Sequence, residues 1–398
     1  MIPGRSYPDP RSDFRTEPMR LLTVTFDPPE GQGGIEGRAM AYTAGLLGRG
    51  IHVEVAALSP HLGKSEEKYQ GTVLLRLPSS LIRLPSTLRS LIRLMSRSSL
   101  DSVFMLSGGS TGAGILVLCY SRLTGRRSAV LFYGRDILQS RRRPAGRISL
   151  LLAVLLANGV GANSRYTSSL LPFRRRTPPV IVYPGVDTSL ASEYSERGRD
   201  RNEPRLLFVG RLVRRKGADL LIEAFGRLRA DMPSVRLDIV GDGPELPNLI
   251  ALARKLDLGD AVTFHGALFG RRLWEVYAKA ALLVLPSRQS AYDVEGFGTV
   301  FLEAGMFGIP SIGTRTGGIP EAVVDGVTGK LVRDGDVDEL GDAIKSLLDD
   351  PEEAERLGTN ARAEALRFSW DRSTDQVLRL LGCGTGEKTP AQRPDARG

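Results

Sequence analysis

The sequence predicts an α/β protein built from two Rossmann-like, doubly wound domains that face a central cleft. Short apolar strands alternate with helices, several strands end in glycine-rich turns, and the alternation stops in a charged segment and then starts again. Alternating strands and helices are typical of parallel sheets. The length of 398 residues exceeds one ordinary domain and fits two. Because ligands bind at the carboxyl ends of such strands, we expect a ligand between the domains.

The first half of the chain shows this alternation from residue 21 onward. The expected strands cover residues 21–26, 51–58, 103–106 and 128–134. The expected helices cover residues 38–50, 85–98, 113–125 and 148–160, and we expect the last of these to be a core helix. Its apolar run is too short for a membrane span, which needs about 20 residues.

The second half repeats the pattern after a charged, proline-containing segment. The expected strands cover residues 205–212, 235–244 (with a turn), 261–268, 282–287 and 310–315, and the expected helices 218–230, 247–256, 299–307 and 371–381. We therefore expect a disordered extension (1–18), an N-terminal domain (19–186), a linker (187–204), a C-terminal domain (205–365), a C-terminal helix that crosses back to the N-terminal domain (366–382) and a disordered tail (383–398).

The few cysteines and the polar N-terminal residues lead us to expect a cytoplasmic protein. The two cysteines, Cys119 and Cys383, make no disulfide framework and show no metal-ligand spacing. The first twenty residues lack the apolar core of a signal peptide.

Positive charge is concentrated in the first half. Residues 71–147 contain thirteen arginines against two acids, a local excess of eleven charges, while the whole chain carries +9. Such an excess attracts anionic lipid or nucleic acid, although ordinary solvated arginines are an equal alternative. With 6% aromatic residues overall there are few rings for base stacking, which argues against nucleic acid. We expect a peripheral protein at the inner face of the cell membrane.

The stretch SAYDVEGFGTVFLEAGMFG, residues 290–308, contains two glutamates among glycines and apolar residues. Glu295 precedes an expected helix that begins at Thr299 and stops at Gly308, and Glu303 lies about one turn inside it. The backbone of Gly296, Phe297 and Gly298 and the first helical N–H groups form a cradle for an anion. Carboxylates on both sides of it suit the two sugar diols of a nucleotide sugar. The alternatives are a solvated loop acid and a helix-surface acid.

Two cations follow the strand at residues 205–212. Arg211 and Lys216 would lie at the mouth of the sheet, where they suit a diphosphate. Taken alone, this pair is better explained as ordinary surface charge on a loop.

The motifs FVGRLVRRKGADLLIEAF, IVGDGPE, FHGAL, EGFGTVFLEAGMFGIPSI and TGGIPEAVVDGVTGKLV together resemble glycosyltransferase family 4, the retaining GT-B enzymes. The wording AYDVEGFG resembles the phosphatidylinositol mannosyltransferase branch. The resemblance covers nearly all of the C-terminal domain. It implies that this domain binds a nucleotide sugar such as GDP-mannose or UDP-glucose, and that the N-terminal domain binds a lipid-linked or glycan acceptor.

The resemblance also implies roles for particular residues. Arg211 and Lys216 would bind the diphosphate, Glu295 the hexose and Glu303 the ribose. The loop containing Gly33 and Gly34 would approach the diphosphate, and backbone near Gly241, Gly243, His265 and Gly266 would recognise the base. The hexose would transfer with retention, and no metal or other cofactor would be required because cations and helix dipoles offset the leaving-group charge.

One departure concerns a histidine that many family members place near the donor sugar. The matching stretch here is LFYGRDI, which has Tyr133 at that position. Tyr133, Arg135 and Asp136 are therefore candidates for contacting sugar or acceptor, although Asp136 could instead cap a helix. The three histidines, His265 included, are better explained as structural or solvated residues. The departure also leaves open a catalytically weak homologue that only binds a sugar nucleotide or an anionic surface.

Overall fold

The computed structural model describes residues 18–26, 36–59, 65–69, 72–78, 89, 92–93, 95–96, 100–172, 177–190 and 202–383. Gly33 and Gly34 lie outside these residues. So do nearly all of the expected extension, most of the expected tail, the middle of the expected linker and much of the helix expected at 85–98.

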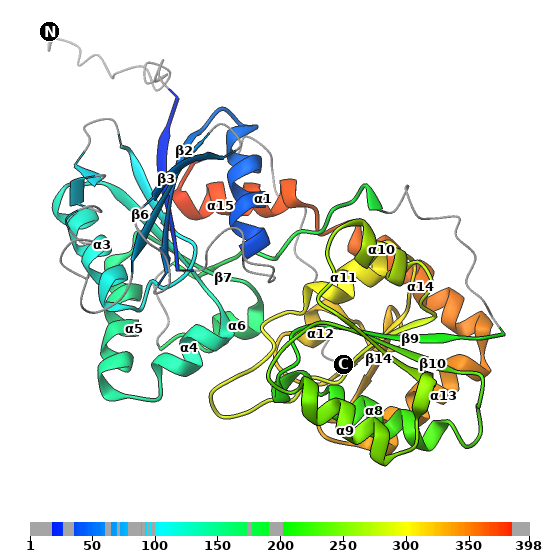
Figure 1. Cartoon of the computed structure of the whole chain (residues 1–398). Coiled ribbons are helices and arrows are strands. Elements are labelled where there is room, and N and C mark those ends of the chain that lie inside the picture. The colour runs from blue at the N-terminus through cyan, green and yellow to red at the C-terminus, as the bar shows by residue number, and fades with distance from the viewer. Residues whose placement is uncertain are drawn as a thin grey trace, which may run out of the picture.

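The described chain forms two α/β domains, each with its own sheet, and confirms the predicted fold class (Figure 1). The N-terminal domain has eight strands in the order β3-β4-β2-β1-β5-β6-β7-β8, all parallel except the β3–β4 hairpin. The strands are β1 (Arg20–Thr25), β2 (His52–Ser59), β3 (Ser65–Tyr69), β4 (Thr72–Pro78), β5 (Ser102–Met105), β6 (Arg127–Phe132), β7 (Gly159–Ala162) and β8 (Val180–Ile181).

Helices cover both faces of this sheet. They are α1 (Glu36–Leu47), α3 (Gly112–Leu123), α4 (Gly134–Ser140), α5 (Pro144–Leu156), α6 (Arg165–Ser169) and α15 (Trp370–Leu381). Leu21 packs with α1 and α15, whereas its neighbour Leu22 packs with α3 and α5 on the other face, as the two-residue period of a strand requires. The C-terminal helix α15 thus completes the core of the N-terminal domain.

The C-terminal domain contains a six-stranded parallel sheet in the order β11-β10-β9-β12-β13-β14. Its strands are β9 (Arg205–Val209), β10 (Arg236–Val240), β11 (Val262–Gly266), β12 (Leu282–Leu285), β13 (Ser311–Thr314) and β14 (Gly329–Val332). Its helices are η2 (Arg214–Lys216), α8 (Ala218–Leu228), α9 (Leu246–Lys255), η3 (Gly259–Ala261), α10 (Arg271–Tyr277), α11 (Thr299–Met306), α12 (Ile319–Ala322), α13 (Val337–Asp349) and α14 (Pro351–Ala365). One continuous apolar core joins this sheet to its helices.

The chain crosses between the domains twice, and the two crossings lie side by side. Val186 donates its N–H to the carbonyl of Phe368 at 2.8 Å. The ring of Tyr183 packs against those of Phe297 and Phe368, with centroids 5.4 and 5.5 Å away. The connection between the domains is therefore a packed aromatic junction.

Helix α5 differs from the core helix expected from residue 148. It begins earlier, at Pro144, and buries one side only, through Leu150, Ala153 and Val154. The exposed side carries four apolar residues at helical spacing: Ile148 (59% exposed), Leu151 (39%), Leu152 (38%) and Leu155 (55%). The apolar run made the helix look buried all round, whereas it packs on only one side. No helix of the described chain is long and apolar enough to span a membrane.

Candidate active site

The loop that carries Glu295, residues 286–298, joins β12 to α11 and is called the glutamate loop below. Helix α11 begins at Thr299 as expected, ends at Met306 and is followed by Gly308 with φ 63°. Gly298 caps it with φ 88°, and a Cβ there would come within 2.7 Å of the Phe301 ring. Only glycine fits this position without strain. The glycine therefore fixes how the loop carrying Glu295 enters the helix carrying Glu303.

Glu295 lies between two cations of the β9–α8 loop. Its Oε2 accepts hydrogen bonds from Lys216 Nζ at 2.5 Å and from Arg215 Nη1 at 2.8 Å. Burial acts to raise the pKa of Glu295, but the charges and hydrogen bonds of Lys216 and Arg215 outweigh it and bring the pKa down to about 2. Glu295 is therefore an anion held by two cations of one loop.

The cations are arranged differently from the expected pair. Arg211 is exposed and forms no ion pair with any described residue. Arg215, which was not predicted, forms ion pairs with Glu295 and Asp293. Gly217, with φ 73°, closes the turn after Lys216, and a Cβ there would lie 2.0 Å from the carbonyl oxygen of Pro286. This close approach holds the turn formed by Arg214, Arg215 and Lys216 against the end of β12. The run RRK signals a cationic turn, but its sequence does not show which side chain points inward.

Glu303 lies within α11 and accepts a hydrogen bond at 2.8 Å from the hydroxyl of Tyr277. Tyr277 is fully buried and stacks on Phe307, with ring centroids 5.3 Å apart. Burial raises the pKa of Glu303, while the Tyr277 hydrogen bond and the charges of Lys216 and Arg38 act in the opposite direction. Glu303 is thus positioned by an aromatic side chain that sequence reasoning missed.

The glutamate loop lies against the N-terminal domain. A Cβ on Gly134 would come within 3.0 Å of Val294 and 3.7 Å of Gly296 Cα, and a Cβ on Gly296 would come within 2.9 Å of Asn163 Nδ2. Tyr133, just before Gly134, is 5% exposed. The structure therefore brings Tyr133 and the Glu295 loop to the same interdomain boundary.

Asp136 does not cap a helix, and that alternative is wrong. Helix α4 begins at Gly134 with Tyr133 in the N-cap position, so Asp136 lies inside the first turn. Arg135 is exposed in the same turn.

Two of the predicted base-recognition residues, Gly241 and Gly243, follow β10, and the other two, His265 and Gly266, end β11. Gly241 and Gly243 have positive φ and pack against the β9–α8 loop, where a Cβ would lie 1.9 Å from Gly210 O and 2.4 Å from Leu212 O respectively. His265 Nε2 lies 2.7 Å from Oδ1 of the buried Asp238, a contact that favours the structural interpretation of this histidine. Gly266, with φ 67°, has open space where a Cβ would be.

An interdomain contact involves Glu321 of α12. Its carboxylate accepts the N–H groups of Arg165 and Tyr166, each at 2.8 Å, and the hydroxyl of Tyr183 at 2.8 Å. It therefore caps helix α6 of the other domain. Nothing in the sequence pairs these segments.

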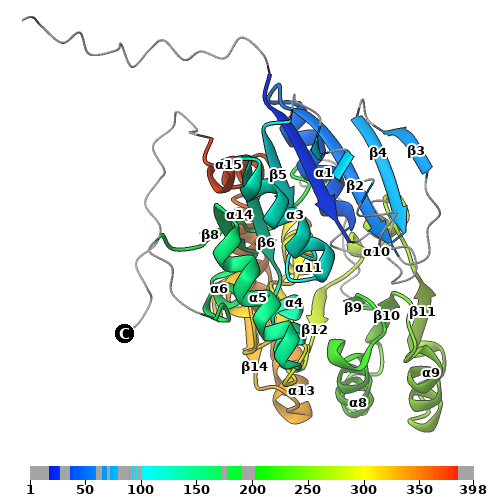
Figure 2. The same ribbon diagram turned by 90° about the vertical axis from the view of Figure 1, so that its left-hand side faces the viewer.

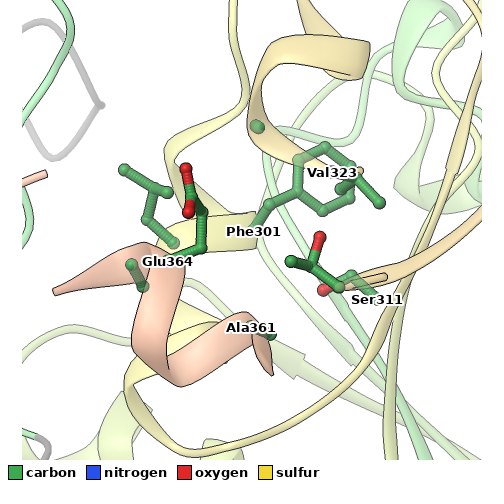
Figure 3. A pocket seen from close by; sticks show the side chains of 9 residues that line it. Phe301, Ser311, Val323, Ala361 and Glu364 are labelled. Carbon is green, nitrogen blue, oxygen red and sulfur yellow. The ribbon is translucent and has the colours of Figure 1, made fainter. Parts of the chain in front are cut away.

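A separate pocket lies around the base of α11, and none of its residues is a predicted site residue (Figure 3). Phe301 of α11, Ser311 of β13 and Glu364 of α14 are among those that line it. Within the described residues, no group of three His, Cys, Asp or Glu side chains could hold a metal ion.

Two facing α/β domains, each with its own mainly parallel sheet, match the GT-B fold. Solved structures support the fold: HepE of Anabaena in complex with UDP (22% identity, TM-score 0.73, 92% of this chain and 100% of that chain) and sucrose-phosphate synthase of Thermosynechococcus elongatus (21%, 0.75, 91% and 98%).

The family model "Glycosyl transferases group 1" matches residues 193–364. A GDP-mannose-dependent alpha-(1-6)-phosphatidylinositol monomannoside mannosyltransferase of Mycolicibacterium smegmatis is 31% identical over 380 residues, which is 91% of this chain and 98% of that protein. A D-inositol 3-phosphate glycosyltransferase of Gordonia bronchialis is 37% identical over 231 residues, 54% of this chain and 49% of that protein. The chain belongs to the group 1 glycosyltransferases, which confirms the predicted resemblance.

Proposed function

We propose that the protein transfers a hexose, with retention and without a metal ion, from a nucleoside diphosphate sugar to a lipid-linked or polysaccharide acceptor. The observation that carries the proposal is that the Glu295 carboxylate lies between Lys216 and Arg215 of the β9–α8 loop. The names of the full-length mycobacterial relatives favour GDP-mannose as donor and a phosphatidylinositol glycolipid as acceptor.

In the reaction that we propose, the acceptor hydroxyl attacks the anomeric carbon on the face from which the diphosphate departs. The bond from that carbon to the phosphate oxygen breaks, and its electron pair goes to the diphosphate. The acceptor proton passes to the departing phosphate oxygen. Lys216 and Arg215, together with Arg211 at the same loop, would offset the charge that grows on the leaving group. Glu295 would orient the hexose and Glu303 the ribose.

A thermal-shift panel of GDP-, UDP- and ADP-sugars tests the donor part of this proposal. A bound donor stabilises the folded state by RT ln(1 + [L]/Kd), so at equal concentration the donor that binds more tightly raises the melting temperature more. We expect a GDP-sugar to give the largest shift, and the shift and the turnover to persist in EDTA. Binding without turnover in the presence of acceptor would favour the alternative, a sugar-nucleotide binding module.

We also infer that the enzyme works at the anionic inner face of the cell membrane, through a surface formed by α5 and α3. Leu116 (41% exposed) and Leu123 (86%) of α3 add to the apolar stripe of α5. These two helices lie on the same face of the N-terminal domain, turned toward the viewer in Figure 2. Arg142, Arg143 and Arg147 are exposed at the start of α5. Apolar side chains surrounded by arginines suit insertion into a bilayer with anionic headgroups.

A further inference from the structure

Arg38 is a buried cation at the boundary between the domains. It lies in the first turn of α1, and only 7% of it is exposed. Its guanidinium carbon lies 5.4 Å from the centre of the Tyr133 ring. Its Nε has no hydrogen-bond partner, and none of the described carboxylates forms an ion pair with it. A buried charge without a counterion is costly, so the arrangement calls for an anion.

The surroundings of Arg38 connect it to the candidate active site. Tyr133, under its guanidinium, is followed by Gly134, which lies against Val294 and Gly296 of the glutamate loop. The charge of Arg38 also acts on Glu303. Burial has the largest effect on the pKa of Glu303 and raises it, whereas the Tyr277 hydrogen bond, the charge of Lys216 and the charge of Arg38 each lower it. Arg38 from one domain and Lys216 from the other therefore both act on the same carboxylate.

We propose that Arg38 binds the diphosphate of the nucleotide-sugar donor from the N-terminal domain, opposite Lys216. This inference rests on the proposed function. A guanidinium forms charge-assisted hydrogen bonds with phosphate oxygens and can do so bidentately, whereas the flat face of Tyr133 holds it in place. A phosphate held from both domains would join the two domains through the bound donor.

The test compares wild type with Arg38→Met and Arg38→Lys in calorimetric titrations with GDP, UDP and the nucleosides guanosine and uridine. We expect Arg38→Met to lower affinity for the preferred diphosphate about tenfold or more and affinity for its nucleoside less than about twofold. The diphosphate affinity of Arg38→Lys should lie between those of wild type and Arg38→Met, because a lysine keeps the positive charge but lacks the planar guanidinium. The melting temperature of unliganded Arg38→Met should equal or exceed that of wild type, because an unpaired buried charge is removed.

Arg49→Met, in the turn that follows the same helix, is the matched control. Arg49 pairs with Asp375 at 2.8 Å, so this variant should lose stability and keep its nucleotide affinity. Equal diphosphate affinity in Arg38→Met and wild type would overturn the inference, as would an equal loss for diphosphate and nucleoside. Unchanged nucleotide affinity with a raised KM for acceptor would also overturn it. A wild-type protein that binds no nucleoside diphosphate would instead contradict the proposed function.

Discussion

The ammonium of Lys216 lies 2.5 Å from the carboxylate of Glu295, across the gap between the β9–α8 loop and the loop that enters α11. Arg215 reaches the same carboxylate oxygen at 2.8 Å. Asp293 lies 3.3 Å from Nε of the same arginine, so the two cations are balanced by two carboxylates. In the reaction that we propose, a donor diphosphate would replace Glu295 as the partner of these cations and would free the carboxylate to bind hexose hydroxyls.

Glu295→Ala should lower kcat more than it weakens donor binding. The variant loses the group that orients the hexose, while Lys216 and Arg215 remain available to the diphosphate. We expect kcat to fall at least about a hundredfold and the donor Kd to change less than about fivefold. Steady-state kinetics and nucleotide titrations separate the two quantities. A variant with wild-type kcat would rule out this role for Glu295.

Glu303→Ala should have the opposite signature. Removal of the ribose contacts should weaken donor binding about tenfold or more, because the ribose hydroxyls lose the carboxylate that accepts their hydrogen bonds. Tyr277→Phe is the control for position, because it removes only the hydrogen bond to Glu303 and keeps the stack on Phe307. It should show a smaller loss in the same titration. Unchanged affinity in Glu303→Ala would contradict the assignment.

The lowered pKa of Glu295 predicts a component of stability that depends on pH. The folded pKa, about 2, lies below the unfolded value near 4.5. The ion pair therefore contributes fully above about pH 4.5, and the contribution is lost as pH falls toward 2. Its full size is about 3 kcal/mol. Urea unfolding of wild type and Glu295→Gln between pH 7 and 3 measures it, and wild type should lose more stability on acidification. Parallel losses in the two proteins would exclude a strong ion pair.

Glu321→Ala should loosen the contact between the domains. The variant leaves the N–H groups of Arg165 and Tyr166 without their cap and the Tyr183 hydroxyl without its acceptor. We expect a loss of about 1–3 kcal/mol in the free energy of unfolding. Asp342→Ala, at an exposed position on α13, is the control and should change stability by less than about 0.5 kcal/mol. Equal stabilities in the two variants would show that the interdomain cap has no energetic role.

The exposed stripe of α5 predicts binding to anionic vesicles. Leu151→Glu combined with Leu155→Glu should lower binding to vesicles containing phosphatidylinositol at least about tenfold, because two apolar side chains no longer insert. Leu366→Glu is the control, since Leu366 is 46% exposed on the C-terminal domain. Binding should fall with added salt and should be weak on neutral vesicles. Equal sedimentation of the double variant and wild type would contradict the proposed surface.

The sequence correctly predicts that a helix begins at Thr299, with Glu295 before it and Glu303 inside it. Glycines and a buried apolar helix leave few other conformations for the loop that carries Glu295. The hairpin of β3 and β4 was missed because its edge strand, Ser65–Tyr69, has the polar sequence SEEKY without apolar alternation. Helix α14 has few apolar residues, although Asp350 and Glu353 at its start are a readable capping signal.

The missed parts of the site depend on contacts between distant segments. Arg215 differs from the adjacent Arg214 only by the direction its side chain takes in a short 3₁₀ turn. Arg38, Tyr277 and Glu321 act on residues far from them in sequence, two of them across the domain boundary. No local pattern encodes such pairs.

The most direct test of the account is transfer of radiolabelled sugar from GDP-mannose and UDP-glucose to lipids in a membrane extract by wild type and Glu295→Ala. The account predicts incorporation by wild type from one of these donors, retained in EDTA, and incorporation reduced at least about a hundredfold in the variant. No incorporation or donor hydrolysis by wild type, or equal incorporation by the two proteins, would contradict it.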